Sequence, residues 1–328
     1  MISVVMTTYN GERYILEQLE SIRIQTRQPD EVIIQDDASD DDTQRLIDHF
    51  IEVHGLGNWK VYRNVKNIGW RNNFYDAISK SHGDIIFFAD QDDIWHPQKI
   101  KTMCELFIHN GMEALYTEKK IIDENGGPDE DRMEKNVFSR RLAKIPFSCS
   151  FYTAKTLGCC MCVSRRIVDF YLELNCPECG HDSQCGRLAL LCDGLWHLDD
   201  ALIDYRIHAA NSSGISRKAS YGQASLEKRK KDLENDINWI EKILCESAGN
   251  HVCMLDEIKR NMVRRSQNAM KVRYQYLSGK KKVTMFSLIK YADCYSGIGM
   301  LIGDWAYRRG MNEKIGLVRW KIKKMTGI

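Results

Sequence analysis

The chain has 328 residues, of which 43% are hydrophobic, so it can bury a full core and carry a smaller module beyond about 200 residues. Its 47 basic and 45 acidic residues give a formal net charge of +2, which excludes a global attraction to nucleic acid and leaves electrostatic function to local clusters. The twelve cysteines include adjacent and irregularly spaced ones, such as Cys159, Cys160 and Cys162, and this favours reduced thiols over a disulfide scaffold.

Neither of the two most apolar terminal segments is predicted to cross a membrane. The N-terminal segment has no basic leader, and its five-residue apolar run before Thr7 is too short for a secretory signal. The later segment, residues 286–301, is interrupted by Lys290 and Asp293. We therefore expect a cytoplasmic protein without transmembrane spans.

In the first 95 residues, short apolar runs alternate with polar, helix-favouring stretches. Strands are predicted at residues 3–7, 31–35, 60–63 and 84–89. Between them, Ile15, Leu19 and Ile22 share one helical face, and the acids at 40–42 favour the start of a second helix. This pattern is typical of buried parallel strands joined by crossover helices, so we expect an α/β nucleotide-binding fold.

The later chain changes in character. Residues 116–136 are turn-rich and charged, which predicts a surface excursion. An apolar run at 157–163, a helix at 164–174 and a last strand at 201–208 follow. From about residue 216 the sequence is charge-dense, and long helices are predicted at 225–247 and 253–276. We predict one domain over residues 1–216 and a mainly helical region over 217–328.

Ligands of open α/β sheets bind beyond the carboxyl ends of the strands, so polar residues at these positions are the first candidates. Thr7 and Tyr9 follow the first strand, and the Tyr9 ring can stack on a base or ribose; a plain turn explains them equally well. Asp36 ends the second strand, where a carboxylate can accept a hydrogen bond from a pyrimidine N–H. Capping of the next helix needs only one such residue, so the additional acids that follow this strand favour a ligand-binding site.

Three carboxylates, Asp90, Asp92 and Asp93, follow the apolar run at 85–89. Clustered carboxylates repel one another, so they are expected where a divalent cation compensates their charge. Mg²⁺ or Mn²⁺ at this point would neutralise the charge on a departing nucleotide diphosphate. A solvated acidic loop is the alternative. The chain has no glycine-rich phosphate loop to take over this task.

Two further candidates lie later in the chain. Asp182 opens a helical segment, where it either caps the helix or takes a proton from an acceptor hydroxyl as general base. Arg206 and His208 lie at the end of the last predicted strand. Arg206 is a candidate phosphate clamp, and His208 is a candidate metal ligand or a hydrogen-bond donor to the diphosphate. A single histidine at a strand end is also commonly just hydrogen-bonded.

Together these segments resemble glycosyltransferase family 2, the inverting enzymes with the GT-A fold, especially its rhamnosyltransferase-like bacterial members. The resemblance covers about residues 1–215. Six landmarks occur in the family's order: VVMTTYNG, QTRQPDEVIIQDDASDDDT, NVKNIGWRNNF, DIIFFADQDDIWHPQKI, the pair HD at 181–182, and YRIHAANSSG. Ser183, Gln184 and Cys185 depart from the aromatic residues that commonly follow HD, which affects the identity of the sugar and acceptor rather than the reaction.

The resemblance implies a role for each site residue. On the nucleotide side it assigns Thr7, Tyr9, Asp36 and Asp90. As metal ligands it implies the DxD pair Asp90 and Asp92, Asp92 being the more direct, with His208 beside the metal and diphosphate. It makes Asp182 the catalytic base. Arg206 and Asp93 remain as diphosphate or loop support, and Asp93 alternatively caps a helix near Pro97.

The implied activity is inverting, Mn²⁺- or Mg²⁺-dependent transfer of a hexose or deoxyhexose from a UDP- or dTDP-sugar. The implied acceptor is a glycan or lipid-linked glycan of cell-surface polysaccharide. A non-catalytic nucleotide-sugar-binding or scaffold protein of the same fold is the alternative, and it would not need Asp182. A sugar-nucleotide pyrophosphorylase would need a glycine-rich basic loop after the first strand, which residues 6–11 lack.

Two other features suggest separate sites. The pair Cys176 and Cys179, with His181, Cys185 and Cys192 nearby, has partial zinc-ligand spacing but no complete second pair. The basic, aromatic segment 306–328 is either a membrane-surface contact at the inner leaflet or a self-packed terminal helix.

Overall fold

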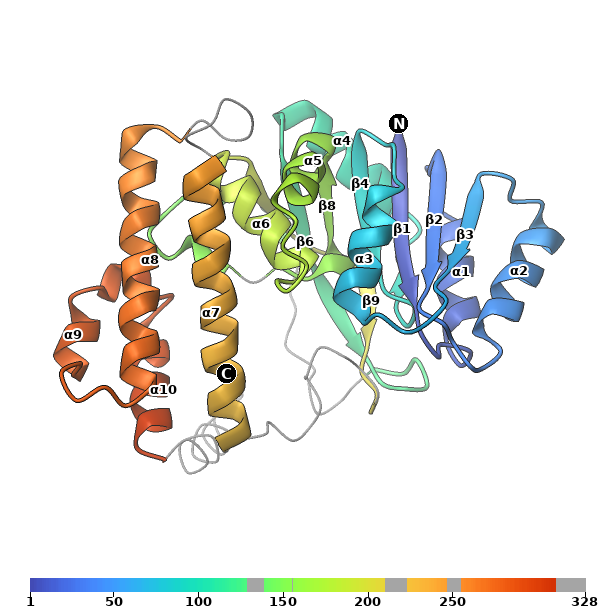
Figure 1. Ribbon diagram of the computed structural model, residues 1–328. Helices are drawn as coiled ribbons and strands as arrows, with labels where there is room; N and C mark the ends of the chain where they lie inside the picture. The colour runs from blue at the N-terminus through green and yellow to red at the C-terminus, as the bar shows by residue number, and fades with distance from the viewer. Residues whose placement is uncertain (129–138, 155, 210–222, 247–254, 311–328) are drawn as a thin grey trace. The chain divides into compact units, whose positions relative to one another are not determined.

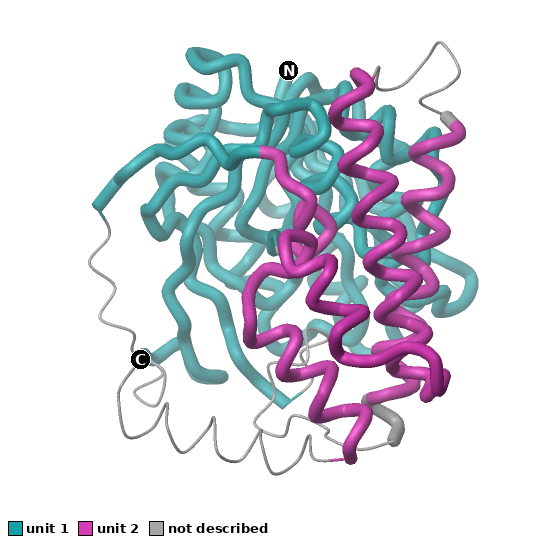
Figure 2. Tube along the Cα trace, turned by 90° about the vertical axis from the view of Figure 1, so that its left-hand side faces the viewer, with its two compact units in different colours: residues 1–146, 155–213 teal, residues 147–154, 214–328 magenta. Residues whose placement is uncertain are grey.

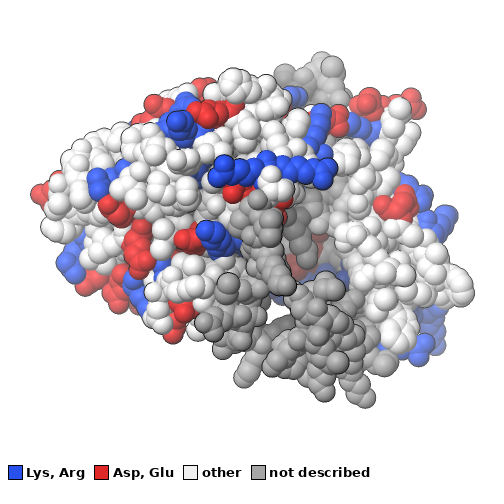
Figure 3. Space-filling view, turned by 180° about the vertical axis from the view of Figure 1, so that it is seen from behind, with Lys and Arg blue, Asp and Glu red and all other residues white. Residues whose placement is uncertain are grey.

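The computed structural model describes residues 1–128, 139–154, 156–209, 223–246 and 255–310. The chain divides into two compact units (Figure 2). The first comprises residues 1–146 and 155–213 and holds the sheet. The second comprises residues 147–154 and 214–328, and its described elements are helices. Basic and acidic side chains are interspersed on the face drawn in Figure 3, as the near-balanced charge predicts.

Four parallel strands form the first half of the sheet, in the order β3-β2-β1-β4 (Figure 1). They are β1 (Ile2–Thr8), β2 (Glu31–Asp36), β3 (Trp59–Arg63) and β4 (Ile85–Ala89), connected by α1 (Ile15–Arg23), α2 (Thr43–His54) and α3 (Trp70–Ser79). Every residue of β1, β2 and β4 is buried, because helices cover the sheet. The four predicted strands are confirmed to within one residue at either end.

The sheet continues from β4 through β8, β6, β9 and β5, with β7 also paired to β9. These strands are β5 (Ile94–Trp95), β6 (Ala114–Ile122), β7 (Leu142–Lys144), β8 (Met161–Ser164) and β9 (Leu195–Arg206). The prediction of a surface excursion from residue 116 was wrong for β6, which pairs in parallel with β9. Its charged residues lie on a half-exposed strand, so the composition resembled a loop.

Three helices complete the first unit: α4 (Lys99–Asn110), α5 (Arg165–Leu174) and α6 (His181–Leu191). Two short 3-10 turns, η2 (Phe151–Thr153) and η3 (Gly158–Cys160), lie in the segment before β8, η2 in the part that groups with the second unit. Ser164 caps α5, since its Oγ accepts a hydrogen bond from the Ile167 amide at 3.2 Å. The cap position of α4 is Gln98, so Asp93 does not cap that helix.

The second unit contains α7 (Gln223–Glu246), α8 (Glu257–Leu277), α9 (Met285–Ile289), η4 (Ala292–Cys294) and α10 (Ile298–Arg308). Its two long helices confirm the helical C-terminal region. The fully buried Asp304 carboxylate lies 2.7 Å from Arg229 and 2.8 Å from Arg273, so its charge is compensated. Among the described residues, no helix has both the length and the apolar composition needed to cross a bilayer.

Candidate active site

A cavity of about 990 Å³ opens in the first unit, beyond the carboxyl ends of β1, β2 and β4. Its lining comes from stretches far apart in the sequence. Among the lining residues are Thr7, Tyr9, Asp37, Trp70, Asp90, Asp92, Asp182 and His208. Most of the residues singled out from the sequence therefore meet at one place, where such a sheet binds ligands.

The loop after β1 is held by the loop after β4. The Tyr9 amide donates to Gln91 Oε1 at 2.8 Å, and Gln91 Nε2 donates to the Tyr9 carbonyl at 3.0 Å. A Cβ on Gly11 would clash with Gln91 Oε1, so a larger residue at this position would displace the Gln91 side chain. In this loop conformation Tyr9 is 46% exposed and lines the cavity, so its ring is available for stacking.

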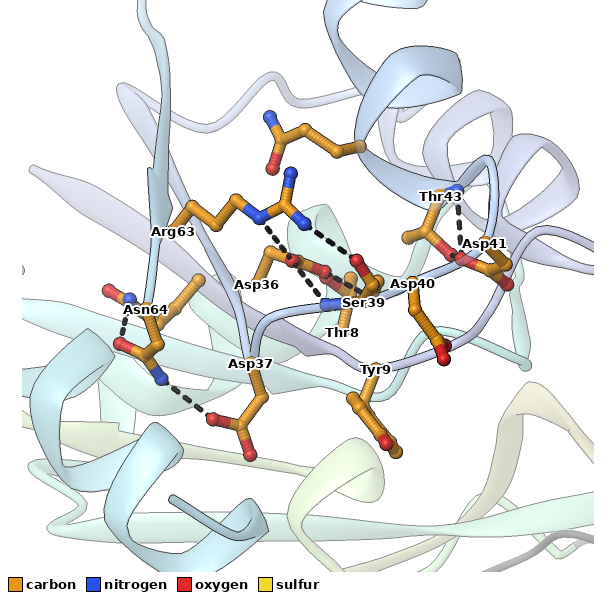
Figure 4. Close-up of polar contacts among 12 residues, drawn as sticks. Thr8, Tyr9, Asp36, Asp37, Ser39, Asp40, Asp41, Thr43, Arg63 and Asn64 are labelled. Carbon is orange, nitrogen blue, oxygen red and sulfur yellow. Dashed lines mark hydrogen bonds and ion pairs between the residues drawn. The ribbon is translucent and has the colours of Figure 1, made fainter. Parts of the chain in front are cut away.

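The two adjacent acids after β2 have different environments (Figure 4). Asp36 is fully buried, and its carboxylate accepts from Thr8 Oγ1 at 2.8 Å and from the Ser39 amide at 2.9 Å. It does not line the cavity, whereas Asp37 does. The Asp37 side chain points away from this group, to the same side as the Tyr9 ring. The base contact expected of Asp36 is therefore better placed for Asp37.

The acidic loop after β4 gathers three carboxyl groups in a largely buried position. Burial, together with the neighbouring Asp92 and Asp182 carboxylates, raises the pKa of Asp90 to about 7. Burial, with Asp92 and Asp90, also raises the pKa of Asp93 well above its usual range. The buried Lys99 amine donates to the Cys159 carbonyl beside this cluster. Such a loop is electrostatically costly without a compensating cation.

Arg206 supports the acidic loop from inside the protein. It is 1% exposed; its Nε donates to the Asp92 carbonyl at 2.8 Å and its backbone amide donates to Asp93 Oδ1 at 3.1 Å. Its guanidinium also donates to Glu17 Oε2 at 2.8 Å and lies over the Tyr14 ring. Arg206 is not among the cavity-lining residues, so its position suits support of the loop rather than a clamp on a phosphate.

His208 lies directly against the acidic loop. Its Nε2 is 2.7 Å from Asp92 Oδ2, and both side chains are mostly buried. The closest set of potential ligand atoms around Asp90 is a different one, formed with Asp93 and Cys159. The structure thus pairs Asp92 with His208 and groups Asp90 with Asp93. The Asp92 carboxylate suits Mn²⁺ or Mg²⁺, and of these two ions Mn²⁺ accepts the additional imidazole nitrogen more readily.

Asp182 lies in the first turn of α6, whose cap position is Gly180. Its Oδ1 accepts only a local hydrogen bond, from the Ser183 amide at 2.7 Å, so Asp182 is not the cap residue. The preceding His181 ring is buried and stacks on Phe74 with ring centres 3.8 Å apart. Burial lowers the pKa of His181 to about 4, so this ring is neutral near pH 7.

Comparison with protein-family models identifies the family of this chain. The model of glycosyl transferase family 2 matches residues 3–170, which is half of the chain. The chain belongs to that family. The match includes the cavity residues Thr7, Tyr9, Asp37, Trp70, Asp90 and Asp92, whereas Asp182 and His208 lie beyond it.

Two curated relatives of this family 2 chain are named as sugar transferases. The dTDP-rhamnosyl transferase RfbG of Shigella flexneri is 29% identical over 240 residues, covering 69% of this chain and 80% of that protein. An Escherichia coli enzyme, the UDP-Glc:alpha-D-GlcNAc-diphosphoundecaprenol beta-1,3-glucosyltransferase WfgD, is 27% identical over 38% of this chain and 48% of its own length.

Two solved structures share the GT-A fold of the family 2 chain. Residues 1–349 of Staphylococcus aureus TarS, in complex with UDP-GlcNAc, match with a TM-score of 0.62 at 16% identity, covering 96% of this chain and 91% of that one. The mannosyltransferase PcManGT of Pyrobaculum calidifontis, in complex with GDP-Man and Mn²⁺, matches with a TM-score of 0.50 at 15% identity, covering 95% and 86%.

The residues with partial zinc-ligand spacing, Cys176, Cys179 and His181, do not come together as a metal site in this family 2 chain. Within the described residues, side chains are grouped closely enough to hold a metal at Asp90, Asp93 and Cys159 and at Cys149, Asp293 and Cys294. Cys176 and Cys179 form no such group with His181, whose ring is stacked on Phe74. The eleven described cysteines are free thiols.

Sequence reasoning missed three residues of the site: Asp37, Glu17 and Trp70. Glu17 lies on α1 between buried apolar positions, and only the fold shows that it meets Arg206. Trp70 is 38% exposed in the cavity. The sequence did contain an indication of Trp70: in the segment NVKNIGWRNNF, a large aromatic residue follows a glycine in a polar loop.

Proposed function

We propose that this glycosyltransferase moves a hexose or deoxyhexose from a UDP- or dTDP-sugar to a hydroxyl of a glycan acceptor, with inversion and with a divalent cation. The observation that carries the proposal is that one cavity contains Asp182, the Asp92–His208 pair and the exposed Tyr9 ring. A base, a cation-binding pair and a stacking surface are the three components that such a transfer needs.

The nucleotide end of the cavity is formed by Thr7, Tyr9 and Asp37. The Asp37 carboxylate accepts from Asn64 Nδ2 and the Ile68 amide through Oδ1, and from the Gly69 amide through Oδ2, at 2.8–2.9 Å. Oδ2 keeps acceptor capacity for the ring N–H of uracil or thymine. The names of RfbG and WfgD include dTDP-rhamnosyl and UDP-Glc, which supports a pyrimidine donor.

The Asp92–His208 pair would hold the cation, with the Asp90 and Asp93 carboxyl groups beside it. Because burial raises the pKa of both groups, a bound cation would favour their ionised forms. When bound, Mn²⁺ or Mg²⁺ would neutralise the charge that develops on the leaving diphosphate. Arg206 holds the main chain of Asp92 and the carboxylate of Asp93, so the pair is fixed before any ligand arrives. A neighbour of the same fold that contains GDP-Man and Mn²⁺ supports this choice of ions.

Asp182 is proposed as the general base. Its carboxylate takes the proton of the acceptor hydroxyl, the acceptor oxygen bonds to the anomeric carbon, and the bond from that carbon to the diphosphate oxygen breaks. Because the diphosphate departs without protonation, one carboxylate suffices, unlike the pair that glycosidases need. A single displacement of this kind inverts the anomeric configuration.

Replacing the base tests the proposal. We expect Asp182→Asn to abolish nucleotide diphosphate release in the presence of acceptor, while calorimetry shows unchanged UDP binding with Mn²⁺. The control is Asp169→Asn, an exposed carboxylate on α5 that pairs with Arg165 outside the cavity. Retained turnover by Asp182→Asn would remove this residue from the mechanism. Acceptor-dependent release by the wild type separates an enzyme from a non-catalytic binder.

A lipid-linked acceptor at a membrane surface is part of the proposal. On the second unit, Phe286 of α9 is 82% exposed and Ile298 of α10 is 75% exposed. Exposed lysines at 280–282 precede α9, and Arg308 donates to the Val283 carbonyl at 2.6 Å, which ties α10 to the start of α9. Exposed apolar side chains beside lysines fit an anionic bilayer surface.

Liposome flotation on phosphatidylglycerol vesicles tests this surface. Phe286→Ser with Ile298→Ser should reduce binding, whereas Ile258→Ser, at the similarly exposed start of α8, should not. From residue 311 on, the basic segment predicted to lie on a membrane falls outside the described residues, so a deletion of 311–328 is measured separately. Equal flotation of all variants would exclude both segments as membrane contacts.

A further inference from the structure

Two large exposed aromatic side chains line the cavity, and only Tyr9 has a role in the proposed donor site. Among the described residues, Tyr9 and Trp70 are the exposed large hydrophobic residues that belong to the cavity lining. Exposing an indole ring to water forgoes the free energy of burying it. An aromatic ring left open in a cavity with a few polar groups is typical of a ligand-binding surface.

The backbone holds Trp70 in place. It is the first residue of α3, after Gly69, which has a φ of 83°. The amides of Ile68 and Gly69 both donate to the buried Asp37 carboxylate at 2.9 Å, and the Asn73 amide donates to the Gly69 carbonyl at 3.0 Å. The ring is therefore carried by an ordered turn, which lowers the entropic cost of stacking a ligand on it.

Trp70 lies beside the proposed base. A Cβ built on Gly180 would lie 2.7 Å from Asp182 Oδ1 and 3.2 Å from Cη2 of Trp70, so both side chains flank the same backbone position. The Arg71 guanidinium lies over the Trp70 ring, 4.4 Å from its centre. Arg71 Nε is buried and has no hydrogen-bond partner. An apolar ring, a cationic donor and a carboxylate thus converge at this end of the cavity.

We propose that Trp70 is the stacking platform for the pyranose ring of the acceptor, holding one C–H face of that sugar so that its hydroxyl reaches Asp182. The inference rests on the proposed function, because it takes Asp182 to be the base. A pyranose presents a face of C–H groups and a rim of hydroxyls, which matches an aromatic surface bordered by Arg71 and Asp182. Tyr9, at the nucleotide end, serves the donor instead.

The test measures sugar binding rather than turnover. The full-length protein is saturated with UDP and Mn²⁺, so that the donor site is occupied. Methyl α-L-rhamnopyranoside and methyl β-D-glucopyranoside are then titrated and followed by saturation-transfer NMR, with glycerol as a hydroxyl-bearing probe without a ring. We expect at least one glycoside to bind to the wild type, with transfer concentrated on the protons of one ring face.

Matched variants assign the contact. Trp70→Ala should weaken glycoside binding about tenfold or more, Trp70→Phe should restore most of it, and both should keep the wild-type affinity for UDP. Tyr9→Ala should show the reverse pattern, with weaker UDP binding and unchanged glycoside binding once UDP is saturating. Circular dichroism confirms that each variant is folded.

Three results would overturn the proposal: no glycoside binds to the wild type, Trp70→Ala binds glycosides as the wild type does, or Trp70→Ala loses UDP affinity. The last would place Trp70 in the donor site. A wrong assignment of the base would be recognised separately. It would appear as turnover by Asp182→Asn, whereas the Trp70 variants are judged by the binding of glycosides and UDP.

Discussion

Asp92 and His208 are 116 positions apart in the sequence, yet His208 Nε2 lies 2.7 Å from Asp92 Oδ2. Arg206, two residues before His208, fixes the Asp92 carbonyl from the buried side. One strand end therefore supplies both the neighbour of the Asp92 side chain and the support of its main chain. This arrangement predicts which residues determine cation binding.

His208→Ala should weaken Mn²⁺-dependent UDP binding by about tenfold or more, because the imidazole Nε2 lies 2.7 Å from Asp92 Oδ2. Calorimetry with UDP at several Mn²⁺ concentrations measures this. His197→Ala is the matched control, since His197 pairs with Glu118 at 3.0 Å and does not line the cavity. Identical Mn²⁺ dependence in the wild type and His208→Ala would contradict a ligand role.

The two acids after β2 should separate into a ligand contact and a structural residue. Asp36→Asn should lower the free energy of unfolding by about 1–3 kcal/mol, because it disrupts buried hydrogen bonds to Thr8 and Ser39. Asp37→Asn should weaken UDP binding. Urea denaturation and calorimetry test the two effects, with the exposed Asp40→Asn as control. A larger loss of UDP affinity in Asp36→Asn than in Asp37→Asn would reverse the assignment.

Gly180→Ala should impair transfer while leaving the fold intact. Gly180 has a φ of −62°, which alanine adopts without strain, but the added methyl would lie 2.7 Å from Asp182 Oδ1. The carboxylate must then turn away from the acceptor position. We expect kcat to fall by about tenfold or more with UDP affinity unchanged. Gly57→Ala, where a Cβ meets no atom within 4 Å, is the control. Full activity of Gly180→Ala would show that the carboxylate tolerates the displacement.

The buried His181 makes stability depend on pH. Burial lowers its pKa to about 4 from an ordinary value of 6.5, so between these values the unfolded chain binds a proton that the folded chain does not. Folding stability should therefore fall as the pH drops from 6.5 to 4, by up to about 3 kcal/mol from this residue. His181→Leu should lose less stability over that range in urea titrations. An unchanged pH dependence in the variant would show that His181 has the same pKa in the folded and the unfolded chain.

The sequence predicted the strands that are buried on both sides, since β1, β2 and β4 each contain an apolar run, at residues 4–6, 32–34 and 85–89. It did not predict β6, because residues such as Glu118 and Lys120 on a half-exposed strand have the composition of a loop. The local sequence pattern therefore sufficed to predict strands that are completely buried. A half-exposed strand such as β6 is identified only by its pairing with a neighbouring strand.

The site shows the same division. Asp90, Asp92, Asp182 and His208 lie in recognisable motifs, and the fold brings them to one cavity. Which of Asp36 and Asp37 faces that cavity depends on the residue at which β2 ends, and a shift of one position moves a side chain to the opposite face. The pairing of Arg206 with Glu17 spans 189 positions, so no local pattern contains it.

The Asp37 carboxylate also connects the two proposed substrate positions. The same two oxygens that face the nucleotide end accept the amides of Ile68 and Gly69, which carry Trp70. A pyrimidine bound to Asp37 would share these acceptors with the turn beneath the indole, so donor occupancy would act on the proposed acceptor platform. Because such coupling is reciprocal, the affinity for each substrate should depend on whether the other is bound.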